Sequence, residues 1–216
     1  MLFFAHRGYI ENGDGENTLE AFERAIEKKM PIELDVRITK DRVPIVFHDA
    51  NLKRLAGIAK KVSDMYYSEI KEIRLKTGEK IPTLKETLEF VNNRTLLLIE
   101  FKTAKKGFVS HRLVKESAKL LENYSGEYML QAFNYFTVKY CKRKFKDIKV
   151  GRLSSRCYGS RYCGDFINYN LFHLNAEKVR NFRKKGIGVY GWAGFCGDRA
   201  KIIQKASELE LDGIIL

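Results

Sequence analysis

Residues 32–49 read IELDVRITKDRVPIVFHD, and their pattern indicates how the sheet is built. Its first half alternates apolar and acidic residues, so one face of a strand over 32–36 is apolar and the other carries Glu33 and Asp35. A second strand-like run, 43–47, follows after only residues 39–42. A connection that short permits an antiparallel hairpin, whereas parallel neighbours need a crossover of about a dozen residues. The second run is therefore predicted to fold back on the first.

Outside this hairpin, short β-rich runs alternate with amphipathic helical patterns such as Val179 to Lys185. The predicted strands are Leu2 to Ala5, Ile32 to Val36, Thr95 to Phe101, Tyr128 to Phe133, Lys149 to Leu153, Phe166 to Tyr169, Ile187 to Trp192 and Gly213 to Leu216. About eight parallel strands with intervening helices are typical of a closed (β/α)8 TIM barrel. We predict one such α/β domain over residues 1–216, with the β-hairpin after strand 2 carrying His48. An open, doubly wound sheet is the alternative.

The first predicted helix, Thr18 to Lys29, has a recognisable start. Asn17 precedes it, and Glu20 stands three residues later, as in a capping box. The sequence thus predicts Asn17 as the N-cap.

Composition narrows the class of protein. The 216 residues carry a net charge of +13, with 44% hydrophobic and 31% charged residues, which excludes a disordered or collagen-like chain. No run approaches the roughly 20 apolar residues of a membrane-spanning helix, and residues 1–5 lack the basic segment of a signal peptide. We therefore expect a cytoplasmic protein. Basic and acidic residues are interspersed, so we expect no nucleic-acid partner; a phosphorylated small substrate or weak contact with an anionic membrane surface suits the charge.

Polar residues gather where a barrel has its active site, at the C-terminal ends of the strands. His6 ends the first predicted strand, and Glu100 and Lys102 share one face at the end of another. If the hairpin turns at residues 40–42, paired residues sum to about 81 to 83 and His48 lies opposite residues 33–35. Singly, each residue has an ordinary structural explanation, as a hydrogen-bonded histidine or a salt-bridged carboxylate. Together they predict a site with two histidines and three carboxylates.

Three carboxylates without cysteine form a hard, oxygen-rich donor set, which favours Mg²⁺ or Ca²⁺ over Zn²⁺. Carboxylates this close repel one another unless a cation neutralises them. Arg7 and Lys102 add permanent positive charge that suits phosphate oxygens. The predicted ligand is therefore a phosphoester.

At this point the motifs resemble the glycerophosphodiester phosphodiesterase family, over nearly the whole chain. The combination of HR, then ExD, then HD is specific, although each pair alone is weak. The stretches that carry the resemblance are His6-Arg7-Gly8, residues 16–22, Glu33-Leu34-Asp35-Val36, Thr39-Lys40-Asp41, Val46-Phe47-His48-Asp49, residues 52–57, Ile81-Pro82-Thr83-Leu84, Glu100-Phe101-Lys102, Gln131-Ala132-Phe133, Gly191-Trp192 and residues 212–215.

The resemblance implies a TIM-barrel hydrolase that uses a divalent cation to release glycerol-3-phosphate and an alcohol from a glycerophosphodiester. Residue by residue, it implies metal ligands at Glu33, Asp35 and Glu100, an acid and base pair at His6 and His48, phosphate contacts at Arg7 and Lys102, and a pocket wall at Trp192. Carried onto this chain, it leaves the preferred alcohol open.

The chain departs from the family pattern in three places. The insertion after the HD motif, residues 57–81, is short, and Ala193 stands where threonine commonly follows the tryptophan. The family typically continues with Thr-Asp-x-Pro after the position of Leu216, so the last strand is expected to be short at its catalytic end.

Two other functions remain open. A lysophospholipase-D-like or other phosphodiesterase acting on lipids would keep the same metal site and expose apolar residues around the mouth, for which Tyr66, Tyr67 and Phe195 are candidates. A non-catalytic binder of anionic surfaces would rest on the net charge of +13, and its binding would fall steeply with salt.

Overall fold

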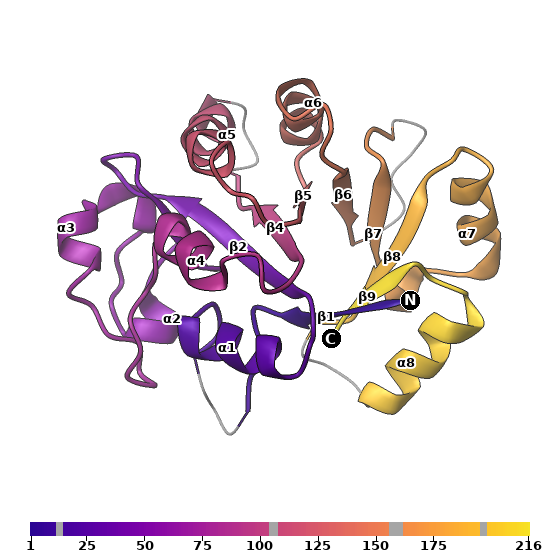
Figure 1. Ribbon diagram of the computed structural model, residues 1–216, viewed down its shortest axis with the longest axis horizontal. Coiled ribbons are helices and arrows are strands. Elements are labelled where there is room, and N and C mark those ends of the chain that lie inside the picture. Colours follow the sequence, from indigo (N-terminus) through magenta and orange to yellow (C-terminus); the bar gives the residue numbers. More distant parts are fainter. Residues whose placement is uncertain (12–14, 104–107, 156–161, 195–197) are drawn as a thin grey trace.

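The computed structural model describes residues 1–11, 15–103, 108–155, 162–194 and 198–216, and its strands form one closed barrel (Figure 1). The sheet has nine strands in the order β1-β9-β8-β7-β6-β5-β4-β2-β3, and β1 also pairs with β2, which closes the ring. The antiparallel member is β3, so the ring itself is parallel. The strands are β1 (Leu2–His6), β2 (Ile32–Ile38), β3 (Pro44–Val46), β4 (Leu97–Phe101), β5 (Tyr128–Ala132), β6 (Val150–Ser154), β7 (Phe166–Asn170), β8 (Gly188–Trp192) and β9 (Gly213–Ile215). The predicted TIM barrel is confirmed.

Helices surround this ring on the outside (Figure 1). The α-helices are α1 (Leu19–Glu27), α2 (Lys53–Ala56), α3 (Tyr67–Ile70), α4 (Leu84–Val91), α5 (Phe108–Leu121), α6 (Tyr135–Lys144), α7 (Ala176–Arg183) and α8 (Arg199–Glu208), with 3-10 turns η1 (Val62–Asp64) and η2 (Leu171–His173). In the part of the chain that the structure describes, none of these helices has the length and apolarity needed to cross a membrane.

The predicted hairpin is confirmed with its register. Val36 pairs with Val46 and Ile38 with Pro44, so paired residues sum to 82. The backbone amide of Phe47 donates to the carbonyl of Asp35 at 2.8 Å, which continues the pairing toward His48. The hairpin thus carries His48 beside the C-terminal end of β2.

The last strand closes the barrel although it is only three residues long. β9 pairs with β8 on one side and with β1 on the other. Beyond it, the amide of Leu216 donates to the carbonyl of Phe4, and the carbonyl of Leu216 accepts from the amide of His6. The predicted shortness of this strand therefore leaves the seam intact.

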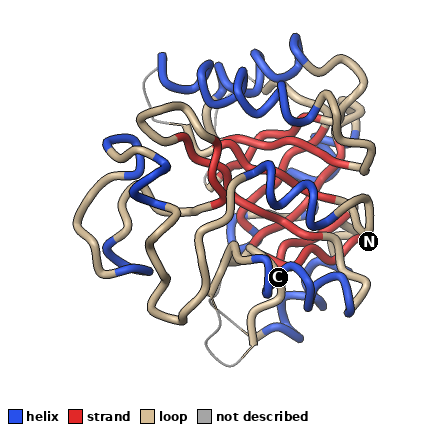
Figure 2. Tube along the Cα trace, turned by 60° about the vertical axis from the view of Figure 1, so that its left-hand side comes forward, coloured by secondary structure: helices blue, strands red, loops and turns tan. Residues whose placement is uncertain are grey.

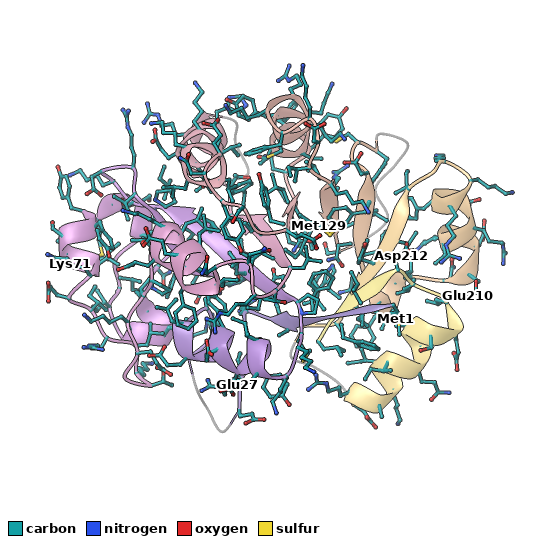
Figure 3. The ribbon with its side chains drawn as sticks, viewed as in Figure 1. Met1, Glu27, Lys71, Met129, Glu210 and Asp212 are labelled. Carbon is teal, nitrogen blue, oxygen red and sulfur yellow. The ribbon has the colours of Figure 1, made fainter. Side chains whose placement is uncertain are left out.

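Two layers of apolar side chains set the position of the polar site. Outward-facing strand residues such as Leu34 and Ile99 pack against the surrounding helices. Inside the ring, a second apolar cluster fills the lumen; its buried members are Phe4, Leu98, Met129, Phe166, Tyr190 and Ile215. Met129 is labelled on β5 in Figure 3. Because this plug occupies the interior, the lumen-facing polar residues lie further along each strand, toward the C-terminal mouth.

Residues 47–82 form a small lobe beside the hairpin, at the left of Figure 1 and again in Figure 2. Its own apolar cluster includes Phe47, Leu52 and Ile70. Lys71, which follows α3, is labelled at its outer edge in Figure 3. This lobe includes the short insertion expected from the sequence, residues 57–81, and its helix α2 precedes that insertion, next to the HD motif.

Two helix starts differ from the sequence prediction. The N-cap of α1 is Thr18, whose hydroxyl accepts from the amide of Ala21, and not Asn17. Asn17 has a left-handed backbone with φ of 59° and turns its side chain toward the barrel, so it is not available to cap the helix. The helix predicted from Val179 begins earlier, at Ala176, because Asn175 caps it ahead of the apolar residues that mark its periodicity.

Candidate active site

Three carboxylates meet at the mouth of the barrel because two neighbouring strands present them in register. Glu33 and Asp35 project from the same face of β2, and Asp35 pairs with Glu100 on β4. One oxygen from each of the three residues lies within 4.8 Å of the others, and all three residues are buried. The alternation read from residues 32–36 therefore yields the acidic cluster that the sequence predicts.

Two permanent cations contact these carboxylates. Lys102 Nζ lies 2.8 Å from Glu100 Oε1 and 3.1 Å from Asp35 Oδ1. Arg7 Nε lies 3.2 Å from Asp35 Oδ2. Asp35 thus sits between both cations, and the cluster of three carboxylates exceeds these two positive charges by one.

The electrostatics of the cluster follow from burial and these contacts. Burial, together with repulsion from Asp35 and Glu100, raises the pKa of Glu33 well above its ordinary value. Burial likewise raises the pKa of Glu100 to about 7, although Lys102 opposes this. For Asp35, burial acts in the same direction, but Lys102 and Arg7 outweigh it and hold the pKa far below its ordinary value. Ionising all three carboxylates together is therefore unfavourable without a further cation.

This donor set fits a divalent cation. Its ligands are carboxylate oxygens, which Mg²⁺ and Ca²⁺ prefer. Burial and their mutual repulsion both disfavour the ionised form of Glu33, and a bound cation would offset both effects. The residues that would hold it are Glu33, Asp35 and Glu100.

The turn after β1 has an unusual backbone that aims Arg7 and its amide at the cluster. Arg7 has φ of 61° and Gly8 φ of 89°. A Cβ on Gly8 would lie 2.7 Å from the Cβ of Ala21 in α1, so only glycine fits this close approach. In this conformation the Arg7 amide donates to Glu33 Oε2 at 3.2 Å. Strain of this kind is typically stored at functional sites.

His6 precedes this turn at the end of β1. Burial and the positive charge of Arg7 lower its pKa to about 4, against weaker opposition from Asp35 and Glu16. His6 is therefore neutral near pH 7.

A chain of charged hydrogen bonds holds the second histidine. His48 Nδ1 lies 2.7 Å from Asp49 Oδ1, and Arg54 of α2 donates to both oxygens of Asp49. Arg54 also donates to both oxygens of Glu16, at 2.8 and 2.7 Å. Glu16 in turn accepts from Arg7 at 2.6 Å. This chain connects the lobe to the turn after β1, and it favours the tautomer of His48 whose Nδ1 carries the proton.

These contacts predict an acid-sensitive stability. Burial by itself raises the pKa of Asp49, but hydrogen bonds from Arg54 and His48 outweigh it and lower that pKa to about 2. Burial also opposes, without preventing, the lowering of the Glu16 pKa by Arg54 and Arg7. Both carboxylates release protons more readily in the folded state than in the unfolded state. Their stabilisation is therefore complete above their ordinary pKa values, near pH 4, and is lost as the pH falls toward 2.

An Arg54→Met variant is accordingly expected to lose less free energy of unfolding than the wild type between about pH 5 and pH 2. Urea denaturation at a series of pH values measures this. Arg143→Met, an exposed position on α6, is the control and keeps the wild-type slope. Equal slopes for Arg54→Met and wild type would show that the network does not shift these carboxylates.

Asn17 and Glu16 contact the site but were not predicted as site residues. Asn17 Nδ2 donates to Asp35 Oδ2 at 3.0 Å, and Asn17 Oδ1 accepts from the Asp35 amide at 3.1 Å. Glu16, only 7% exposed, joins Arg7 to Arg54. Both residues belong to the stretch 16–22, which carries part of the family resemblance. That membership was the signal in the sequence that could have identified them.

Aromatic side chains line one side of the mouth. Trp192, at the end of β8, donates from Nε1 to the carbonyl of Ser154 at 3.3 Å. Phe133, after β5, packs edge to face on Trp192 with ring centroids 6.2 Å apart. Of the aromatic residues suggested by the sequence, Tyr66 is exposed in the lobe, where Lys40 lies over its ring.

Tyr67 also lies in the lobe, on α3, and is partly buried. Phe195 lies outside the described residues.

Lys102 and the basic end of α6 offer a test of site charge against surface charge. Lys102 is 12% exposed among the carboxylates, whereas Lys142 and Lys144 pair on the outside of the barrel with Asp165 and Glu122. We expect Lys102→Met to lower kcat/KM by a factor that corresponds to about 2 to 4 kcal/mol of lost transition-state stabilisation. This is the usual effect of losing one charge-assisted donor to the transition state. Steady-state kinetics measures this.

Neutralising Lys142, Arg143 and Lys144 together is the matched control. The change in kcat/KM is expected to correspond to less than about 1 kcal/mol of transition-state stabilisation, and to come from a salt-sensitive association rate. The reverse ordering would place the functional surface on α6.

A parallel barrel with buried carboxylates, Lys102 and Arg7 at its C-terminal mouth is typical of one class of protein, enzymes that act on phosphate esters. The chain belongs to the glycerophosphoryl diester phosphodiesterase family, whose sequence model matches residues 6–216. It is thus a phosphoric diester hydrolase, as the motifs predict.

Individual relatives agree with this assignment. A glycerophosphodiester phosphodiesterase of Caldanaerobacter subterraneus subsp. tengcongensis is 30% identical over 99% of this chain and 93% of its own length. Human lysophospholipase D GDPD1 is 32% identical over 68% of this chain and 49% of its own. The structure of an Oleispira antarctica phosphodiesterase in complex with sn-glycerol-3-phosphate superposes with a TM-score of 0.87, at 22% identity, over 100% of this chain and 92% of that chain.

Proposed function

We propose that this enzyme hydrolyses glycerophosphodiesters to glycerol-3-phosphate and an alcohol, and that it depends on Mg²⁺ or Ca²⁺. The observation that carries the proposal is the buried cluster of Glu33, Asp35 and Glu100 with Lys102 and Arg7 beside it. The relative from Oleispira antarctica, whose structure contains the product sn-glycerol-3-phosphate, supports the same small-molecule substrate.

Lys102 and Arg7 act on the phosphoryl group as permanent cations. A phosphodiester carries one negative charge that repels nucleophiles, and more negative charge accumulates on its oxygens as the nucleophile attacks. Lys102 offers a point charge and Arg7 a planar set of donors to those oxygens. Glu33, Asp35 and Glu100 would hold a divalent cation, which would add electrophilic stabilisation of the same charge.

His6 and His48 move the protons. The low pKa of His6 keeps it neutral near pH 7, so we assign it as the base that takes a proton from the nucleophile. His48 has Asp49 on Nδ1, and this hydrogen bond favours the charged imidazolium, although burial lowers its pKa overall. We therefore assign His48 as the acid that protonates the leaving alkoxide as the bond from phosphorus to the alcohol oxygen breaks.

The nucleophile is either water or the free hydroxyl of the glycerol moiety next to the phosphate, and the two routes differ in products. Water gives glycerol-3-phosphate directly, with one solvent oxygen in the phosphate. The hydroxyl gives a cyclic phosphate that water then opens. Both use the same base and acid, and a transient cyclic phosphate in quenched reactions distinguishes them.

Trp192 and Phe133 form the wall against which we place the organic part of the substrate. Their edge-to-face contact and the hydrogen bond from Trp192 to Ser154 hold the tryptophan ring in one orientation. A rigid aromatic wall beside cationic groups suits the apolar face of a glycerol backbone.

A lipid substrate is the second candidate, favoured by exposed aromatic residues near the mouth. Phe133 and Phe172 follow the C-terminal ends of β5 and β7, and Phe136 lies in the first turn of α6; they are 42%, 57% and 66% exposed. Exposed apolar groups next to a site are typical of enzymes that take amphiphilic substrates or rest on a membrane surface. The similarity to human lysophospholipase D GDPD1 points the same way.

Two substrates with the same headgroup separate these functions. Glycerophosphocholine and lysophosphatidylcholine both release choline, which one assay detects. We expect the higher kcat/KM with glycerophosphocholine. A higher value with lysophosphatidylcholine, lowered by Phe136→Ser, would favour the lipid reaction, and no release from either would contradict both functions for choline esters.

A further inference from the structure

We propose that Gln131 and Asn168 are positioning residues that fix the carboxylate of Glu33 for metal binding. Gln131, on β5 beside Glu100, donates from Nε2 to Glu33 Oε1 at 3.3 Å. Asn168, on β7, donates from Nδ2 to Gln131 Oε1 at 3.1 Å. The three residues form a relay that crosses the barrel lumen from β7 through β5 to β2. The inference rests on the proposed metal site.

The chemistry of the groups gives this relay one direction. An ionised carboxylate only accepts hydrogen bonds, so Gln131 must turn its NH₂ group toward Glu33. Its carbonyl oxygen then faces Asn168, which must present its own NH₂ group. Removing either amide therefore disturbs the groups that follow it in the relay.

Glu33 is held at both oxygens. Oε1 accepts from Gln131, and Oε2 accepts from the backbone amide of Arg7 at 3.2 Å. Amide donors add no charge but fix the plane of the carboxylate. A ligand oriented in advance binds a cation with less reorganisation.

The placement of these amides argues against a purely structural role. Gln131 and Asn168 are 1% and 0% exposed in a lumen otherwise plugged with apolar side chains. A buried amide without partners is destabilising, and apolar residues of similar volume would fill this space at least as well. Gln131 also belongs to the Gln131-Ala132-Phe133 motif, and its contact with Glu33 gives that motif a function.

Calorimetric titration of the metal-free protein with Mg²⁺ and with Ca²⁺ tests the relay without using activity. We expect Gln131→Met to weaken metal affinity by about 10- to 100-fold, the usual effect of losing a hydrogen-bond partner of a metal ligand. Asn168→Leu is expected to weaken it by a smaller factor, because it acts on Glu33 only through Gln131.

The double variant separates a relay from two independent effects. If Asn168 acts through Gln131, adding Asn168→Leu to Gln131→Met leaves the affinity unchanged from that of Gln131→Met alone. Met129→Leu is the control, because Met129 lies on the same strand and lumen face without joining the relay. It is expected to bind metal as the wild type does. Thermal unfolding in chelator verifies that each variant is folded.

Three outcomes overturn the proposal. Wild-type metal affinity in both single variants would show that the amides do not act on Glu33. Multiplying effects in the double variant would show independent actions. If the wild type binds neither cation, the proposed metal site is wrong and the relay has no metal ligand to position. This result is a failure of the proposed function, and it differs from a failure of the relay alone. If Gln131→Met does not fold, Asn168→Leu alone still decides, because it leaves Gln131 in the protein and removes only the hydrogen bond that orients its side chain.

Discussion

Replacing His6 or His48 with alanine is expected to lower kcat by about 10²- to 10⁴-fold, the usual contribution of a positioned proton transfer. Neither change removes a carboxylate, so metal affinity measured by calorimetry stays near that of the wild type. His173→Ala is the control, because His173 is exposed in the turn after β7 and is expected to keep full activity. Near-normal turnover in either variant would make that histidine structural.

A substrate with a good leaving group distinguishes the two histidines. In a p-nitrophenyl ester of glycerol-3-phosphate the leaving group is p-nitrophenolate, which departs without protonation. Its hydrolysis therefore does not need the acid. We expect it to restore most of the activity of His48→Ala and little of that of His6→Ala. The opposite pattern would exchange the roles of acid and base.

Replacing Glu33 with alanine is expected to abolish measurable metal binding and turnover together, because Glu33 is one of three ligands and the cation stabilises the transition state. The fold should survive. Glu33 is buried beside Asp35 and Glu100, which repel it, so its removal is expected to leave the thermal stability in chelator unchanged or higher.

The control for this variant is Glu23→Ala, which removes a surface carboxylate of α1 that pairs with Arg94. It is expected to bind metal and turn over as the wild type does. Wild-type metal affinity in Glu33→Ala would contradict the assignment of the acidic cluster.

Much of the site was predictable because strand geometry acts over short distances in sequence. Alternation alone placed Glu33 and Asp35 on one face, and hairpin length alone set the pairing to within one of the observed sum of 82. Strand ends of a parallel barrel share one mouth, which brought His6 and Lys102 near those carboxylates. These deductions need only backbone periodicity.

The residues that hold the site in place were not predictable in the same way. Glu16 contacts Arg54 across 38 residues of sequence, and Gln131 contacts Glu33 across 98. Such contacts depend on how loops return to the barrel and which lumen layer each strand presents, and neither appears in local periodicity. The prediction of Asn17 as the N-cap of α1 was wrong for a related reason. Its side chain is of the capping type, but its left-handed backbone directs that side chain to Asp35.

The most direct test of the account is release of glycerol-3-phosphate from glycerophosphocholine by protein stripped with a chelator and then titrated with Mg²⁺ or Ca²⁺. We expect no release above background in the chelator and a return of activity that saturates with one of the two ions. Undiminished release in excess chelator would contradict it.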